Sequence, residues 1–186
     1  MKQKKRVNYV DNKKFYQEIV KYKASVKEAA EKGLDKPRIP EYIGECIFKI
    51  AEKLSTKPCF VNYSYRDEMI LDGVENCILY FDDYNPDYNE SVAPNPFAYF
   101  TQVIYFAFLR RINKEEKNRY TIYKNFQETI GINELTKLVD SDDKVIMHKS
   151  MYDNINDFMM KFERKENEKK QKRKQTKEGL IKFYEE

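Results

Sequence analysis

Apolar side chains recur at intervals of three and four residues along most of this 186-residue chain. That spacing lines one face of an α-helix, whereas a strand with one buried face needs strict alternation. The pattern predicts helices over residues 12–30, 43–54, 65–81, 96–114, 125–129, 133–139 and 151–162. We therefore expect an all-α protein.

Helix boundaries carry their own signals. Asp11 is suited to the N-cap of the first helix, and Gly33 to the stop that follows it. Pro40 suits the first turn of the second helix, and Ser64 is a candidate cap for the third. A loop rich in Asn, Asp and Pro then runs to Pro96.

The predicted helix over 96–114 is unusually aromatic. Rings surround most of its circumference: Phe97, Tyr99, Phe100, Tyr105, Phe106 and Phe108. One face, formed by Phe97, Phe100, Ile104, Ala107, Phe108 and Arg111, is sufficient for a core. Tyr99, Tyr105 and Phe106 then remain for a second face.

The composition changes abruptly after Phe162. Residues 163–179 include no apolar side chain, so this segment cannot offset its ordering entropy by burial. It is either a solvated helix extension or a mobile tether. Four apolar residues follow it, Leu180, Ile181, Phe183 and Tyr184. They are typical of a linear motif that docks into a partner, the alternative being that they fold back on this chain's own core.

Several classes of protein are disfavoured. No apolar run approaches the roughly 18–20 residues that span a bilayer. The basic start, residues 1–6, lacks the apolar segment of a secretory signal. We expect neither a membrane-spanning nor an exported protein.

The sequence also offers little for catalysis, and we expect no enzyme, cofactor or metal. A zinc site would need widely spaced ligands: Cys46, Cys59, Cys77 and His148, the only imidazole. Neither GxGxxG nor GxxxxGK[ST] occurs. An acidic cluster, Asp82, Asp83 and Asp87, could bind a cation, but a polar loop that ends a helix is the simpler interpretation.

The order of motifs in the middle of the chain resembles region 2 of the sigma-70 family of transcription initiation factors. Asp72-Gly73 precedes an apolar helix, Tyr84-Asn85-Pro86 stands where that family has F-D-P, and Phe97-Ala98-Tyr99-Phe100-Thr101 covers an F-S-T-Y-A-T-like aromatic helix. Arg110-Arg111 follows.

One branch of that family is more similar still: the late-transcription sigma factors of T-even-type phages. The likeness covers about residues 40–117 and the last seven. It is carried by the segments 43–44, 50–55, 68–70, 72–75, 95–99, 101–102, 111–115 and 180–185.

The resemblance implies a helical bundle like sigma region 2 with a flexible charged C-terminal tail. It divides the chain into an N-terminal helix and link (1–39), a polymerase- and promoter-binding domain (40–117), a variable helical region (118–162), a charged tether (163–179) and a clamp-binding tail (180–186).

The resemblance also implies three sets of binding residues. The DNA-binding set is Tyr99, Phe100, Gln102, Tyr105, Arg110, Arg111, Lys114, Lys117 and Arg119. The polymerase-binding set is Glu68, Asp72, Glu75 and Asn76. The clamp-binding set is Leu180, Ile181, Phe183 and Tyr184.

General physical chemistry is consistent with the first two sets. Stacking on an aromatic ring contributes about 1–3 kcal/mol per unstacked base, and cations neutralise phosphates. An acidic, partly apolar helix suits a basic coiled coil. The tandem tryptophans of housekeeping sigma factors would fall near Gln102 and Val103, so neighbouring aromatics must replace them.

The expected function is to direct a host RNA polymerase core to phage late promoters and to help melt an A·T-rich −10-type element. The implied partners are the coiled coil of the largest polymerase subunit, the flap of the second-largest subunit, promoter DNA, a sliding clamp and a phage co-activator, in the cytoplasm of an infected bacterium. A structural or regulatory DNA- or RNA-binding protein that acts without polymerase stays open, because the basic stretch 169–177 can bind phosphates by itself. The promoter consensus, the host and the role of residues 118–160 are left open.

Overall fold

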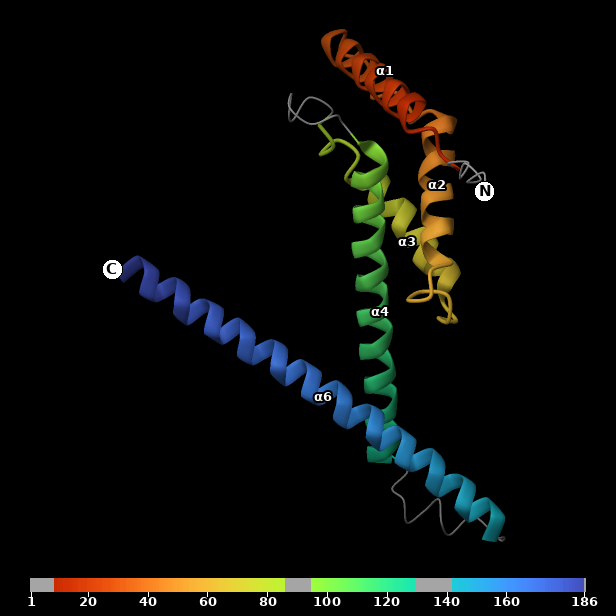
Figure 1. The fold of residues 1–186 in the computed structure, drawn as a ribbon, viewed down its shortest axis with the longest axis vertical. Helices are drawn as coiled ribbons and strands as arrows, with labels where there is room; N and C mark the ends of the chain where they lie inside the picture. The colour runs from red at the N-terminus through yellow and green to blue at the C-terminus, as the bar shows by residue number, and fades with distance from the viewer. Residues whose placement is uncertain (1–8, 86–94, 130–141, 186) are drawn as a thin grey trace, which may run out of the picture. The chain divides into compact units, whose positions relative to one another are not determined.

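The computed structural model describes residues 9–85, 95–129 and 142–185, with the side chains of 142–149 and 177–185 left undescribed. Its elements are α1 (Asn12–Glu31), α2 (Glu41–Ser55), α3 (Arg66–Leu79), α4 (Pro96–Thr129) and α6 (Asp142–Glu185) (Figure 1). No strand occurs among the described residues. The prediction of an all-α protein is confirmed.

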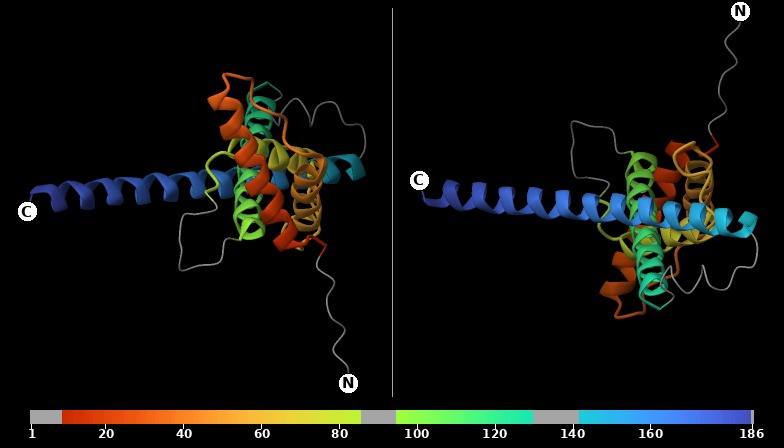
Figure 2. Two further views of the ribbon diagram at one scale, coloured as in Figure 1. Left: turned by 90° about the horizontal axis from the view of Figure 1, so that it is seen from above. Right: turned by 90° about the horizontal axis from the view of Figure 1, so that it is seen from below.

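The chain divides into two compact units, Met1–Ile112 and Asn113–Glu186, and the boundary falls within α4. In the first unit, which we call the bundle unit, α1, α2 and α3 gather around the N-terminal half of α4 (Figure 2). The resemblance sets residues 1–39 apart, whereas α1 contributes Phe15 and Tyr22 to the core of this unit.

Local capping explains where the first and fourth helices begin. The carboxylate of Asp11 accepts hydrogen bonds from the backbone N–H groups of Lys13 and Lys14, as expected for an N-cap. At the start of α4, the Asn95 side chain accepts from the N–H of Ala98 (3.1 Å), and Pro96 occupies the first helical position. Gly33 adopts the left-handed conformation (φ +65°) after α1, which confirms it as the stop.

The expected cap of α3 is wrong. The helix begins at Arg66 with Tyr65 in the cap position, and no side chain caps it. The preceding residues are folded into turns in which the N–H groups of Phe60 and Val61 both donate to the Lys57 carbonyl. Buried Phe60 anchors these turns, which place Ser64 one residue too early to act as the cap.

Aromatic rings dominate the core of the bundle unit. Phe100 of α4 lies at its centre, with its ring centroid 5.6 Å from those of Phe15 and Phe81. Tyr22 meets Phe81 edge to face, and Phe60 meets Phe108 in the same way. Such pairs stabilise a core beyond the area they bury, so rings from four separate segments hold this unit together.

The second unit, which we call the paired-helix unit, joins the C-terminal part of α4 to α6. Its contacts run in opposite directions along the two helices, so that later residues of α4 contact earlier residues of α6. The contacting pairs are Glu116–Lys165, Tyr120–Phe162, Tyr123–Phe158 and Gln127–Asn156.

Both α4 and α6 are longer than the sequence pattern predicts. Neither Gly nor Pro interrupts residues 115–129, and Tyr120 and Tyr123 find partners on α6. The helix expected to end near 114 therefore continues to Thr129. The backbone of 163–179 is helical, which matches the solvated helix extension among the two alternatives. The helix expected near 133–139 lies outside the described residues.

Candidate functional site

Helices α3 and α4 lie in direct contact because one glycine removes a side chain between them. A Cβ built on Gly73 would lie 2.9 Å from Cγ2 of Ile104 and 3.1 Å from Cε1 of Phe108. One turn further along α3, the thiol of Cys77 is buried and contacts the carbonyl of Phe100 (3.9 Å). Burial raises the pKa of this thiol to about 12, so it serves as a small packing residue.

Two polar contacts join the same helices at one edge. Arg111 of α4 donates from Nε to Oδ2 of Asp72 (2.6 Å) and from Nη2 to Oδ1 (2.8 Å), a bidentate pair. Arg110 donates to Oδ1 of Asn76 (2.5 Å). Two residues of the polymerase-binding set thus hold two cations of the DNA-binding set. In this structure Asp72 and Asn76 orient the arginines of α4.

The remaining two residues of the polymerase-binding set, Glu68 and Glu75, are exposed on α3. Exposed apolar side chains accompany them on this helix: Leu71 is 64% exposed, Ile78 51% and Leu79 69%. The apolar side chain of Ile78 is exposed because α3 turns Gly73 and Cys77 toward α4 instead. Sequence reasoning overlooked Leu71 and Leu79, whose only signal is that they fall off the apolar stripe. We call the five exposed residues the α3 outer face: Glu68, Leu71, Glu75, Ile78 and Leu79.

The rings of α4 divide into buried and exposed ones. Phe100 is fully buried, so in this structure its ring offers no surface to a base, contrary to its place in the DNA-binding set. Tyr99 is half-buried, with its ring 5.0 Å from that of Tyr84 and its hydroxyl donating to the carbonyl of Tyr80 (3.2 Å). Burial raises the pKa of Tyr99. Its ring therefore supports the fold and keeps only part of its surface accessible.

Tyr105 and Phe106 are the exposed rings of this half of α4, at 41% and 49%. Their centroids lie 5.9 Å apart, and Tyr105 also meets Phe60 edge to face at 5.7 Å. Gln102, one turn before Phe106, is exposed. Phe106 was assigned to the second aromatic face but not to the DNA-binding set, and its exposure makes it a candidate for stacking.

The other cations of the DNA-binding set belong to the paired-helix unit. Lys114, Lys117 and Arg119 are exposed on α4. The guanidinium of Arg119 lies over the ring of Phe158 on α6, 5.5 Å from its centroid. Arg119 therefore also contributes to the pairing of the two helices.

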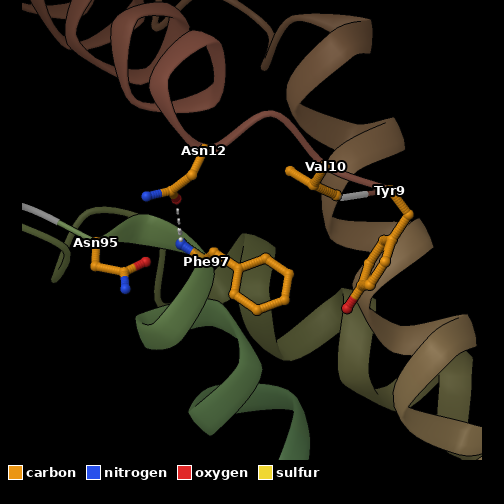
Figure 3. A pocket seen from close by; sticks show the side chains of 5 residues that line it. All are labelled: Tyr9, Val10, Asn12, Asn95 and Phe97. Carbon is orange, nitrogen blue, oxygen red and sulfur yellow. Dashed lines mark hydrogen bonds between the residues drawn. The ribbon is translucent and has the colours of Figure 1, made fainter. Parts of the chain in front are cut away.

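A small pocket of about 180 Å³ lies where α1 and α4 begin (Figure 3). It is lined by Tyr9, Val10, Asn12, Asn95 and Phe97. Asn12 accepts a hydrogen bond from the N–H of Phe97 (3.2 Å), and the Tyr9 ring meets Phe97 edge to face. These contacts link the two helix starts, and none of the three predicted residue sets lines this pocket.

The side chains of the clamp-binding set, Leu180, Ile181, Phe183 and Tyr184, lie outside the described residues. So does that of His148. Within the described part, no group of three or more His, Cys, Asp or Glu is placed to hold a metal ion. Asp82 of the acidic cluster instead pairs with Lys36 (2.7 Å). Over the same residues, none of the helices is both long and apolar enough to cross a bilayer.

No family model matches this chain, and no curated protein is significantly similar to it. The class that the fold defines is an all-α protein. Function is therefore inferred from the surfaces of α3 and α4 together with the motif order in the sequence.

Proposed function

We propose that this protein is a sigma factor that directs a host RNA polymerase core to phage late promoters. It recognises and helps melt an A·T-rich −10-type element, and a DNA sliding clamp activates it. It contributes contacts and carries out no catalysis of its own.

One observation supports this proposal above the others. The α3 outer face is acidic and apolar, and α3 is joined through Asp72 and Asn76 to the arginines of the ring-bearing helix α4. A basic coiled coil of polymerase would dock on the α3 outer face through charge attraction and apolar burial. Docking on α3 would then position α4 relative to the DNA.

The exposed residues of α4 have the chemistry that capture of a melted strand needs. Tyr105 and Phe106 offer ring faces on which unstacked bases can stack, at about 1–3 kcal/mol per base. Gln102 lies beside them and has an amide that can pair with adenine. These residues replace the tandem tryptophans of housekeeping sigma factors.

The C-terminal tail supplies the second attachment. Leu180, Ile181, Phe183 and Tyr184 dock on the sliding clamp at the end of the charged segment 163–179. Linking a weak clamp contact to a weak promoter contact raises their combined occupancy through effective concentration.

Run-off transcription on purified polymerase core, with and without this protein, tests the proposal directly. We expect specific transcripts from late promoters only when the protein is present. Transcript starts that do not change on addition of the protein would contradict the proposal.

A second experiment tests the docking surface on α3. The variant Glu68→Gln/Glu75→Gln/Leu71→Ala should lose retention by polymerase core in a pull-down, by about tenfold or more in affinity. The matched control neutralises two exposed acids of α1, Glu28→Gln/Glu31→Gln, and should be retained like the wild type. Equal retention of all three proteins would remove the α3 outer face from the proposal.

A third experiment separates melting from binding. Tyr105→Ala should reduce open-complex formation while binding to polymerase core is unchanged, because Tyr105 is 41% exposed and lies outside the α3 outer face. Tyr99→Ala should reduce open-complex formation more than core binding, and Tyr99→Phe controls for the hydrogen bond to Tyr80. Parallel loss of both activities in Tyr99→Ala would identify Tyr99 as a residue of the fold alone.

Deletion of residues 180–186 tests the tail. Core binding should stay intact, and stimulation by the sliding clamp should disappear. An unchanged response to the clamp would refute the docking role of the tail.

The alternative, a nucleic-acid-binding protein that acts without polymerase, is favoured by one feature, the basic stretch 169–177. Retention by polymerase core separates the two functions, since a nucleic-acid-binding protein that acts alone need not bind polymerase.

A further inference from the structure

The basic stretch of α6 is the most concentrated charge on the chain. Lys169, Lys170, Lys172, Arg173 and Lys174 place five cations within six residues. No acidic residue occurs from 169 to 177. The structure makes this stretch helical, and all five side chains are exposed or half-exposed.

The helix arranges these cations on one side. At about 100° per residue, the five side chains spread over an arc of about 200°. Gln171 and Gln175 occupy the opposite side. A segment that is merely charged in sequence becomes a basic helical face, which we call the α6 basic face.

Most of the α6 basic face has no ionic partner among the side chains that the structure describes. Nearer the start of the segment, cations are paired: Lys165 with Glu116, Arg164 with Glu168 and Lys169 with Glu166. In contrast, Lys170, Lys172, Arg173 and Lys174 form no ion pair with the residues that the structure describes. Neighbouring cations lower the pKa of Glu166, first through its hydrogen bond with Lys169 and also through Lys170 and Arg173. The field of this face is positive and available to an anionic partner.

The chemistry of the face selects among polyanions. A helix that lies on a membrane needs an apolar side, and residues 163–179 have no apolar side chain. A single strand is gripped chiefly by stacking on aromatic rings, and this segment has none. Binding to duplex DNA requires neither an apolar helix side nor aromatic rings, since it depends on the neutralisation of phosphates by cations.

Charge density also favours a duplex. The rise of an α-helix places the five cations within a length of about 7.5 Å along the helix axis, or one cation per about 1.5 Å. Double-stranded DNA carries one negative charge per about 1.7 Å. The two rods are therefore matched in charge per unit length.

We infer that the α6 basic face is a second DNA-binding site, which binds the phosphate backbone of duplex DNA without sequence preference. The site goes beyond the proposed function, because it requires neither polymerase nor a promoter. It would hold duplex DNA next to the residues that the sequence assigns to clamp binding.

The test measures binding of the full-length protein to a short labelled DNA duplex of mixed sequence, by fluorescence anisotropy, between about 50 and 200 mM salt. The variant is Lys170→Gln/Lys172→Gln/Arg173→Gln/Lys174→Gln, in which Gln preserves helix propensity. We expect its affinity at low salt to fall at least about tenfold, and the slope of log affinity against log salt to shrink by about 3–4.

The matched control removes the same number of charges from exposed positions of the bundle unit: Lys13→Gln/Lys21→Gln/Lys27→Gln/Lys32→Gln. Its affinity should stay within about twofold of the wild type. An equal loss of affinity in the two variants would show that only the net charge of the protein matters, and would overturn the inference. Unchanged binding by the α6 variant would do the same.

Two competing ligands complete the test. A single strand of the same sequence and vesicles of phosphatidylcholine with phosphatidylserine should each compete more weakly than the duplex. Stronger competition by either would overturn the assignment to duplex DNA. Polymerase is absent from the binding assay. A failed run-off experiment therefore leaves the duplex-binding result unaffected, and a failure to bind duplex DNA leaves the run-off result unaffected.

Discussion

The bundle unit and the paired-helix unit are stabilised in different ways. The bundle unit buries side chains from its helices and from the turns between them, including fully buried Phe15, Phe81, Phe100 and Phe108. Among the described side chains of the paired-helix unit, only Ile155 and Met159 are buried. Stacked, half-exposed rings, ion pairs such as Glu116–Lys165 and other polar contacts add to its helix pairing.

The difference indicates which surfaces have a rigid support. Exposed groups of the bundle unit, such as Tyr105 and the α3 outer face, are attached to a dense core. The cations of α6 are attached to a helix whose basic stretch has no buried side chain among those described. The exposed groups of the bundle unit therefore suit recognition that needs fixed geometry, and the cations of α6 suit neutralisation of phosphates.

The largest expected effect concerns thiol reactivity, which reports on the bundle unit alone because it holds all three cysteines. Cys77 is buried and its pKa is raised to about 12, whereas Cys59 is exposed. Under native conditions a thiol reagent should modify Cys77 at least about a thousandfold more slowly than Cys59. Comparable rates, followed by mass spectrometry, would mean that the core opens freely and that the contrast between the units is false.

Phenylalanine truncations compare the two units directly. Phe100→Ala should lower the free energy of unfolding by about 3–5 kcal/mol, since it empties the centre of the core. Phe162→Ala should cost about 1 kcal/mol, because its ring is half-exposed in the pairing with Tyr120. Urea unfolding followed by circular dichroism measures both, and a larger loss in Phe162→Ala would reverse the comparison.

Glycine substitutions test how tightly α3 and α4 pack. Gly73→Ala should destabilise by about 1–3 kcal/mol, because its methyl group would collide with Ile104 and Phe108. A methyl group added to Gly44 of α2 would meet no atom within 4 Å, so Gly44→Ala should stabilise by about 0.5–1 kcal/mol. Thermal melts of the two variants should shift in opposite directions. A shift in the same direction would indicate that α3 and α4 separate easily.

Ion pairs give the smallest expected difference between the units. A double-mutant cycle on Asp72 and Arg111 should yield a coupling of about 1–2 kcal/mol, since the pair is bidentate and partly buried. The same cycle on Glu116 and Lys165, a more exposed pair, should yield less than about 0.5 kcal/mol. Equal couplings would show that burial does not distinguish the two pairs.

Sequence reasoning predicted local features well where a single helix decides them. The periodic stripe in α2, the Asp11 cap and the Gly33 stop depend on residues within a few positions of each other, and the structure confirms them. The start of α3 was missed, because buried Phe60 and the turns around it decide where that helix begins.

Part of the candidate site was predictable from the sequence. Helical periodicity assigns Phe100 to the core face of α4 and leaves Tyr105 and Phe106 for a second face, and the structure confirms that Phe100 is buried while Tyr105 and Phe106 are exposed. The pairing of Asp72 with Arg111 was not predictable, since the two residues are 39 positions apart. Such contacts depend on the angle and distance at which two helices meet.

Helical periodicity is enough to predict that the chain is helical and where most helices lie, and the composition shows that nothing apolar follows Phe162 until Leu180. These features arise from the short-range geometry of the α-helix, in which side chains three and four residues apart share a face. Two features depend instead on how the helices pack: Asp72 pairs with Arg111, and Leu71 and Leu79 of α3 are left exposed. Both features follow from the close approach of α3 and α4 at Gly73, which selects the faces that meet and leaves the others to solvent.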